Sequence, residues 1–95
     1  MAYYLYMMSN GKYGTIYTGV TNNLVSRGND HRQKMKEGFT KRYNLVKLVY
    51  FETYENVKDA IHREKCIKAW KREWKINLIE KDNPEWLDLY PEILK

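Results

Sequence analysis

Two runs of strand-favouring residues at the start of the chain predict a β-hairpin. Residues 3–8 (Tyr-Tyr-Leu-Tyr-Met-Met) form the first run and residues 15–20 the second. Asn10-Gly11 and Gly14, which lie between the runs, are typical turn residues. A loop centred between residues 11 and 12 sets Tyr6 opposite Tyr17 on one face of the sheet, where the two form a packing pair or part of a site. Gly19 shares that face and is expected to leave space above it.

Helical periodicity takes over after the hairpin. Asn22 or Asn23 is placed to cap a helix that runs from Leu24 to about Lys36 and ends at Gly38. The pattern therefore predicts one helix directly after the second strand.

The second half of the chain predicts one more strand and two more helices. Residues 46–54 form the strand, and Asn56 caps a helix over residues 57–68. A further helical stretch, residues 71–81, stops at Asn83-Pro84. The order ββαβαα predicts an α/β fold with a three-stranded, mainly antiparallel sheet flanked by helices. Four apolar residues are expected to fold back onto the core as a C-terminal cap: Trp86, Leu89, Ile93 and Leu94.

The length of 95 residues suits a single domain that spans residues 1–95. Cys66 is the only cysteine, which excludes an intramolecular disulfide and a zinc site built from cysteines. There is no secretory signal and no stretch apolar enough to span a membrane. We therefore expect a cytoplasmic protein.

The charge of the chain favours a polyanionic partner. The net charge is +5, and basic residues gather at 32–42 and 63–75. Such stretches suit nucleic acid, although solvated helix faces in a basic protein account for the charge equally well. The residues expected to contact nucleic acid are Arg32, Lys34, Lys41, Arg42, Lys68 and Lys71.

Both of the first two predicted helices carry ionisable groups where their periodicity requires apolar ones. The inward stripe of the first helix is Leu24, Arg27, Gly28, His31, Met35, and that of the second is Val57, Ala60, Ile61, Glu64, Lys68. A partly exposed polar edge on the first helix and an ordinary i,i+4 pair on the second would explain each break separately. Complementary breaks in two facing helices point instead to a functional site.

These residue types fit the hydrolysis of a phosphate ester. A carboxylate such as Glu64 holds a divalent metal ion, which polarises the phosphate. A guanidinium such as Arg27 pairs with charge on the phosphate oxygens. A phenol or an imidazole removes the proton from the attacking water.

The hairpin, Arg27 and Glu64 together resemble the GIY-YIG endonuclease superfamily over nearly the whole chain. Tyr4-Leu5-Tyr6 stands at the first family motif and Tyr17-Thr18-Gly19 at the second. Arg27, His31 and Glu64 match the helix arginine, the helix histidine and the metal-binding glutamate of the family. The Asn-Pro-Glu-Trp sequence at residues 83–86 is similar to the end of small stand-alone bacterial members.

The resemblance implies roles for these residues. Tyr17 would be the general base, supported by Tyr6, while Arg27 steadies the scissile phosphate and Glu64 holds one Mg²⁺ or Mn²⁺ ion. His31 joins the catalytic set. Asn77 is a weakly aligned candidate for a late asparagine of the family. Two residues depart from the pattern: Tyr4 replaces a glycine, and Gly28 stands where a bulkier residue is usual.

The leading hypothesis is a metal-dependent endonuclease that cleaves DNA in repair or recombination. The alternative is a nucleic-acid-binding module with little or no catalytic turnover of its own, and a third hypothesis is a protein-interaction domain. Larger members of the family carry separate DNA-binding domains. A protein partner that supplies specificity is therefore a further expectation.

Overall fold

The computed structural model describes residues 1–32 and 46–94, apart from the side chains of residues 28 and 30–32. Three strands form its sheet: β1 (Tyr3–Ser9), β2 (Ile16–Thr21) and β3 (Lys47–Tyr54). Their order is β2-β1-β3, and both pairings are antiparallel. The expected α/β class and the expected order of elements are confirmed.

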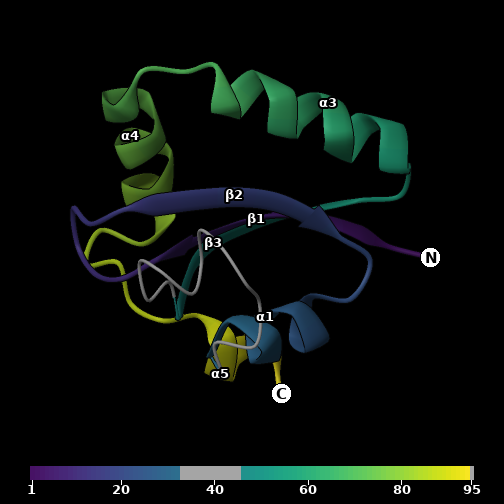
Figure 1. Cartoon of the computed structure of the whole chain (residues 1–95), viewed down its shortest axis with the longest axis horizontal. Coiled ribbons are helices and arrows are strands. Elements are labelled where there is room, and N and C mark those ends of the chain that lie inside the picture. Colours follow the sequence, from purple (N-terminus) through teal and green to yellow (C-terminus); the bar gives the residue numbers. More distant parts are fainter. Residues whose placement is uncertain (33–45, 95) are drawn as a thin grey trace.

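Helices cover both faces of the sheet (Figure 1). Helices α3 (Val57–Lys68) and α4 (Arg72–Asp82) lie on one side, and α1 (Leu24–Arg32) and the short α5 (Tyr90–Ile93) lie on the other. Because the central strand β1 is covered on both faces, its residues 5–9 are all buried. Its alternate side chains enter two separate cores, with Leu5 and Met7 on the α3 side and Tyr6 and Met8 on the α1 side.

The hairpin loop lies one residue further along the chain than the sequence predicts, which corrects the expected register. Ser9 pairs with Ile16, so Tyr6 lies opposite Gly19, not opposite Tyr17. Side chains close the loop: the Ser9 hydroxyl donates to the Gly11 carbonyl at 2.7 Å, and the Thr15 N–H donates to Asn10 Oδ1 at 3.1 Å. The register differs from the expected one by two residues, so Tyr6 and Tyr17 still share a face.

Asparagine caps begin α1 and α3, as the sequence predicts. The N–H of Ser26 donates to Asn23 Oδ1 at 3.0 Å, which identifies Asn23 as the cap of α1. The N–H of Lys58 donates to Asn56 Oδ1 at 2.7 Å, and α3 has the expected bounds. The predicted end of α1 near Lys36 and Gly38 lies outside the described residues.

Helix α3 is rotated about its axis relative to the expected orientation. Its buried residues are Ala60 and Ile67, whereas Val57 and Ile61 are exposed. The predicted inward stripe was therefore wrong at three positions, because Lys68 is exposed as well. The rotation turns Ile67 into the core against Leu5 and Met7.

The segment after α4 packs along the outer edge of β3. Asn83 is buried, and its side-chain amide donates to the carbonyls of Val49 at 3.1 Å and Leu87 at 2.9 Å. Trp86 is 1% exposed and donates its indole N–H to Glu80 Oε2 at 2.8 Å. The expected C-terminal cap is thus confirmed for Trp86, and also for Leu89 and Ile93, which pack against the core on the α1 side. It was wrong for Leu94, which is exposed.

No helix in the described part of the chain is long and apolar enough to cross a membrane.

Candidate active site at the edge of β2

The Tyr6 side chain lies across Gly19 on the edge strand β2. A Cβ built on Gly19 would stand 2.8 Å from the Tyr6 hydroxyl oxygen and 2.9 Å from Tyr6 Cζ, closer than real Cβ contacts. The expectation of open space above Gly19 was therefore wrong, because the Tyr6 ring fills that space. The absence of a side chain at Gly19 lets the Tyr6 hydroxyl extend over β2 from the central strand.

Tyr6 and Tyr17 form a tilted ring pair, with centroids 6.1 Å apart and an angle of 47° between the planes. Burial raises the pKa of Tyr6 well above its usual value, and the neighbouring Tyr17, to which Tyr6 is hydrogen-bonded, raises it further. A hydrogen bond that raises the pKa of a phenol stabilises its protonated form. The hydrogen bond to Tyr17 therefore favours the protonated form of Tyr6.

Two charged groups act on the Tyr6 hydroxyl from different helices. The positive charge of Arg27 on α1 lowers the pKa of Tyr6, and the negative charge of Glu64 on α3 raises it, although both effects are smaller than that of burial. Helices α1 and α3 lie on opposite faces of the sheet (Figure 1). Charges from both helix layers therefore act on the Tyr6 hydroxyl at the edge of the sheet.

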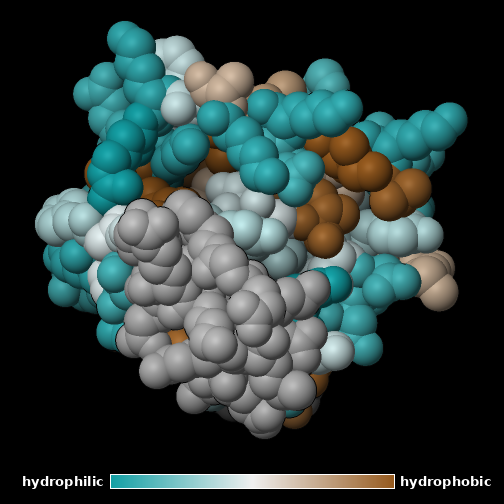
Figure 2. Space-filling model, viewed as in Figure 1, coloured by the Kyte–Doolittle hydropathy of each residue, from teal (hydrophilic) through white to brown (hydrophobic). Residues whose placement is uncertain are grey.

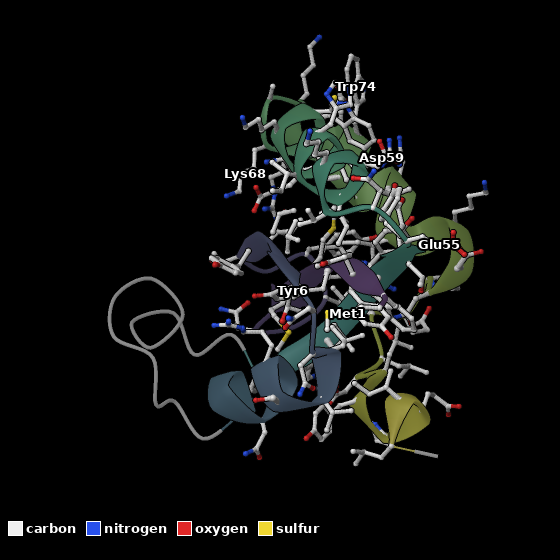
Figure 3. All side chains as sticks on the ribbon, turned by 90° about the vertical axis from the view of Figure 1, so that its right-hand side faces the viewer. Met1, Tyr6, Glu55, Asp59, Lys68 and Trp74 are labelled. Atoms are coloured by element: carbon white, nitrogen blue, oxygen red, sulfur yellow. The ribbon has the colours of Figure 1, made fainter. Side chains whose placement is uncertain are left out.

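The same edge faces the viewer in Figure 2. Residues of intermediate hydropathy lie at the centre of this face, below hydrophilic atoms of the α3 layer and beside a group of hydrophobic residues. In Figure 3 the Tyr6 side chain lies at the middle level of the molecule, and Lys68 lies above it.

Glu64 is half-buried and paired within its own helix. Its Oε2 lies 3.4 Å from Lys68 Nζ, and 20% of its side-chain surface is exposed, against 53% for Lys68. The i,i+4 pair that the sequence offered as an ordinary explanation is therefore present. The carboxylate is nevertheless close enough to the phenols to change the pKa of Tyr6.

The structure tests only part of the predicted nucleic-acid contacts. Lys68 and Lys71 are exposed. The side chain of the predicted catalytic His31 lies outside what the structure describes. The same holds for the side chains of the other four predicted contacts, which are Arg32, Lys34, Lys41 and Arg42.

Asn77 does not join the predicted site residues in any contact that the structure records. It lines a separate pocket on α4 together with Trp70, Trp74 and Leu78. The tentative alignment of Asn77 with a late asparagine of the family therefore gains no support.

A metal ion at this site would rest on a single protein carboxylate. Among the described residues there is no group of three or more His, Cys, Asp or Glu side chains that could hold a metal ion. Mg²⁺ is commonly bound by one or two carboxylates and completes its shell with water and substrate phosphate. Glu64, a half-buried carboxylate whose charge acts on Tyr6, fits that donor set, because its oxygens suit a hard cation.

The sequence reasoning missed a charged network between β3 and α3. Arg63 donates to both oxygens of Glu52, from Nε at 3.1 Å and from Nη2 at 3.0 Å, and the hydroxyls of Tyr50 and Tyr54 donate to the same carboxylate. Burial alone would raise the pKa of Glu52, but these hydrogen bonds hold it below its usual value. The alternation Tyr50, Glu52, Tyr54 was the available signal, because every second residue of a strand faces the same side.

Two arginines in the basic stretch 63–75 have structural partners. Arg63 is bound to Glu52, and Arg72 Nη2 donates to the carbonyls of Tyr13 at 2.7 Å and Gly14 at 2.6 Å. Part of the charge that suggested a nucleic-acid surface therefore holds helices to the sheet and the hairpin loop.

Comparison with known proteins places this arrangement in a family. The family model described as the GIY-YIG catalytic domain matches residues 2–77. A UPF0213 protein of Clostridium perfringens is 43% identical over 65 residues, which cover 68% of this chain and 70% of that protein. A UPF0213 protein of Staphylococcus aureus is 36% identical over 67 residues, which cover 70% of this chain and 82% of that protein.

A solved structure shares the fold. The solution NMR structure of a UPF0213 protein from Bacillus halodurans superposes with a TM-score of 0.55 and covers 87% of each chain, at 24% sequence identity. The family match extends from the start of β1 into α4, and so includes both tyrosines, Arg27 and Glu64. The chain belongs to the GIY-YIG family.

Proposed function

We propose that this protein is a metal-dependent endonuclease that hydrolyses phosphodiester bonds in DNA. The observation that carries the proposal is the Tyr6–Tyr17 ring pair, on which the charges of Arg27 and Glu64 act from helices on opposite faces of the sheet. Arg27 and Glu64 also stand at positions where helical periodicity predicts apolar residues, and such breaks in a pattern favour a functional site. Membership of a family described by its catalytic domain supports the same function.

Tyr17 is the general base in this proposal, and Tyr6 orients it. The raised pKa of Tyr6 makes that phenol a poor proton acceptor at neutral pH. Tyr17 is the more exposed of the two, and its hydrogen bond with Tyr6 holds its hydroxyl in place. Once Tyr17 has lost its own hydroxyl proton, a water placed against its oxygen would transfer a proton to it while attacking phosphorus, and the P–O bond to the leaving oxygen would break.

Arg27 and Glu64 act on the phosphate from the two helix layers. The half-buried guanidinium of Arg27 offers paired N–H donors to two phosphate oxygens and offsets the charge that builds up on them. Glu64 would hold Mg²⁺ or Mn²⁺, which as a Lewis acid stabilises charge on the phosphate oxygens. His31 on α1 is assigned to the same catalytic set.

The proposed substrate is a branched or flapped DNA of the kind formed in repair and recombination. A domain of 95 residues offers little surface for reading sequence, so substrate shape is the expected basis of selection, with a protein partner supplying further specificity.

Cleavage of a defined DNA panel tests the proposal. Branched, flapped, single-stranded and blunt duplex DNAs are incubated with the protein in Mg²⁺, in Mn²⁺ and in EDTA. We expect products only with metal, and none from the variants Tyr17→Phe and Glu64→Gln. Lys65→Ala, which removes an exposed charge next to Glu64, serves as the control and should cleave like the parent. Metal-independent products, or full activity in Glu64→Gln, would contradict the proposal.

The Glu64–Lys68 pair favours a second candidate, a nucleic-acid-binding module with little turnover. Lys68 Nζ already neutralises the carboxylate at 3.4 Å, so a metal ion must compete with it. A protein that bound the panel but cleaved no member of it, with either metal, would identify the module.

A further inference from the structure

The outward side of α4 carries an exposed tryptophan beside a small apolar pocket. Trp74 is 50% exposed, whereas Trp86 is 1% exposed and packs in the hydrophobic core. The buried side of α4 is occupied by Ile79, so Trp74 does not contribute to holding this helix on the sheet. A half-exposed indole beside a pocket offers an aromatic surface to a binding partner.

The pocket beside Trp74 has fixed walls. It encloses about 400 Å³ and is lined by Trp70, Trp74, Asn77 and Leu78. The Trp70 ring stands edge-on to Trp74, with centroids 6.2 Å apart and an angle of 77° between the planes.

Trp70 is held in turn by the charged network on β3. The guanidinium carbon of Arg63 lies 5.1 Å from the centre of the Trp70 ring, and Arg63 is bound to Glu52 by two hydrogen bonds. The pocket is therefore preformed, which lowers the entropy cost of binding a flat ligand.

Cations surround this aromatic surface. Lys71 Nζ lies 5.9 Å from the centre of the Trp74 ring. Lys71 is the N-cap of α4, and positions 74, 78 and 81 of the helix lie on one side, so Lys71 and Lys81 flank Trp74 and Leu78. The acidic Glu80 projects elsewhere and accepts the Trp86 indole N–H. The surface thus combines an aromatic face, an amide from Asn77 and lysines at both ends.

We propose that Trp74 and this pocket bind an unpaired base of a nucleic acid strand, and that the flanking lysines bind the neighbouring phosphates. Every nucleobase offers a flat face that stacks on indole, and single-strand-binding proteins combine such stacking with basic side chains. A peptide partner would gain less from two lysines beside the ring than a phosphate backbone does. Paired bases are inaccessible to Trp74, so the site selects strands with unpaired nucleotides.

The proposed base-binding site would hold the unpaired part of the DNA that the proposed nuclease cleaves, so its role rests on that proposed function. In Figure 3, Tyr6, Lys68 and Trp74 lie at successively higher levels of the molecule. Lys68 is the exposed partner of Glu64 at the end of α3, and Lys71 lies three residues later, at the N-cap of α4. A single strand that leaves the candidate active site past Lys68 would meet Trp74, so flapped DNA is the substrate class that the arrangement fits.

Binding measured in EDTA tests the site without any cleavage. The ligands are a blunt duplex, the same duplex with a single-stranded tail, and a third in which the tail has abasic nucleotides. We expect Trp74→Ala to bind the tailed duplex about tenfold more weakly than the parent, since one stacked base commonly contributes about that factor. Trp74→Phe should restore most of the affinity for the tailed duplex. The parent and all variants should bind the blunt duplex with the same affinity.

Leu87→Ala is the matched control, because Leu87 is an exposed apolar residue outside the pocket. The parent itself should bind the abasic tail as weakly as Trp74→Ala binds the normal tail, which tests the idea even if the alanine variant folds poorly. Equal affinity of the parent for normal and abasic tails, or an equal loss on blunt and tailed duplexes in Trp74→Ala, would overturn the proposal. Because metal is absent, failure of the nuclease function would leave these affinities unchanged.

Discussion

Glu64 is the residue whose functional and structural contributions separate most cleanly. Replacing it with Gln or Ala removes the proposed metal ligand and breaks the pair with Lys68. An i,i+4 pair between partly exposed side chains stabilises a protein by about 0.3–0.5 kcal/mol, so the fold should survive. We expect the melting temperature to change by only a few degrees, while cleavage of a flapped DNA disappears and DNA binding persists. Outright unfolding of Glu64→Ala would instead show that Glu64 is structural.

Gly19 couples the fold to the candidate active site at a single backbone position. Gly19→Ala places a methyl group 2.8 Å from the Tyr6 hydroxyl, and the buried Tyr6 ring has to move. Overpacking of this kind costs about 1–3 kcal/mol. We expect urea unfolding to report that loss and cleavage to fall by more than in Tyr6→Phe, which removes only the hydroxyl. A Gly19→Ala variant with parental stability and activity would rule out the close approach of Tyr6.

At the scale of elements, the Glu52 network joins β3 to α3 and predicts how stability depends on pH. The pKa of Glu52 is lowered in the fold, so its contribution is complete above its usual value of 4.5 and is lost as pH falls through the folded pKa. Burial and the bond to Glu52 raise the pKa of Tyr54 to about 12 from its usual 10, so that contribution is complete below pH 10 and is lost as pH rises through 12.

We therefore expect the contribution of this network to the free energy of unfolding to be constant from about pH 5 to 10. Glu52→Gln should cost about 2 kcal/mol at pH 7, because Arg63 loses a charged partner, and should flatten both limbs. Urea titrations from pH 3 to 11 give the measurement. Glu55→Gln, an exposed neighbour, is the control and should follow the parent; a Glu52→Gln curve identical to the parent's would show that the network contributes nothing.

At the scale of the whole molecule, DNA binding should be tolerant of sequence and should weaken with salt. Each lysine or arginine that neutralises a phosphate releases counterions, so the logarithm of the binding constant falls linearly with the logarithm of salt concentration. Lys71→Gln should reduce that slope by about one unit.

Lys12→Gln makes the same change in net charge and is the control, because Lys12 lies 3.3 Å from Glu85 and is already paired. Equal slopes in the two variants would mean that net charge governs binding, with no defined lysine surface. A flat dependence on salt in the parent would contradict the electrostatic account altogether.

Local signals in the sequence were enough to predict the elements of this protein. Asn56 caps α3 where predicted because an Asx cap needs only its own side chain and the N–H two residues later. The strands, their order and the α/β class follow from apolar runs and turn residues in the same way. The motif residues also indicated the family, because five motif positions in the right order and at the right spacing are specific in combination.

Only the tertiary structure decided the geometry between elements. The hairpin register depends on Ser9 and Asn10 side chains that close a wide loop, and the orientation of α3 depends on where Ile67 meets the β1 core. The partner of Arg63 is Glu52, 11 residues away, so no helical periodicity could have revealed it. Contacts between distant segments are set by packing of the whole chain, and for that reason the filled space above Gly19 and the pocket beside Trp74 became visible only in three dimensions.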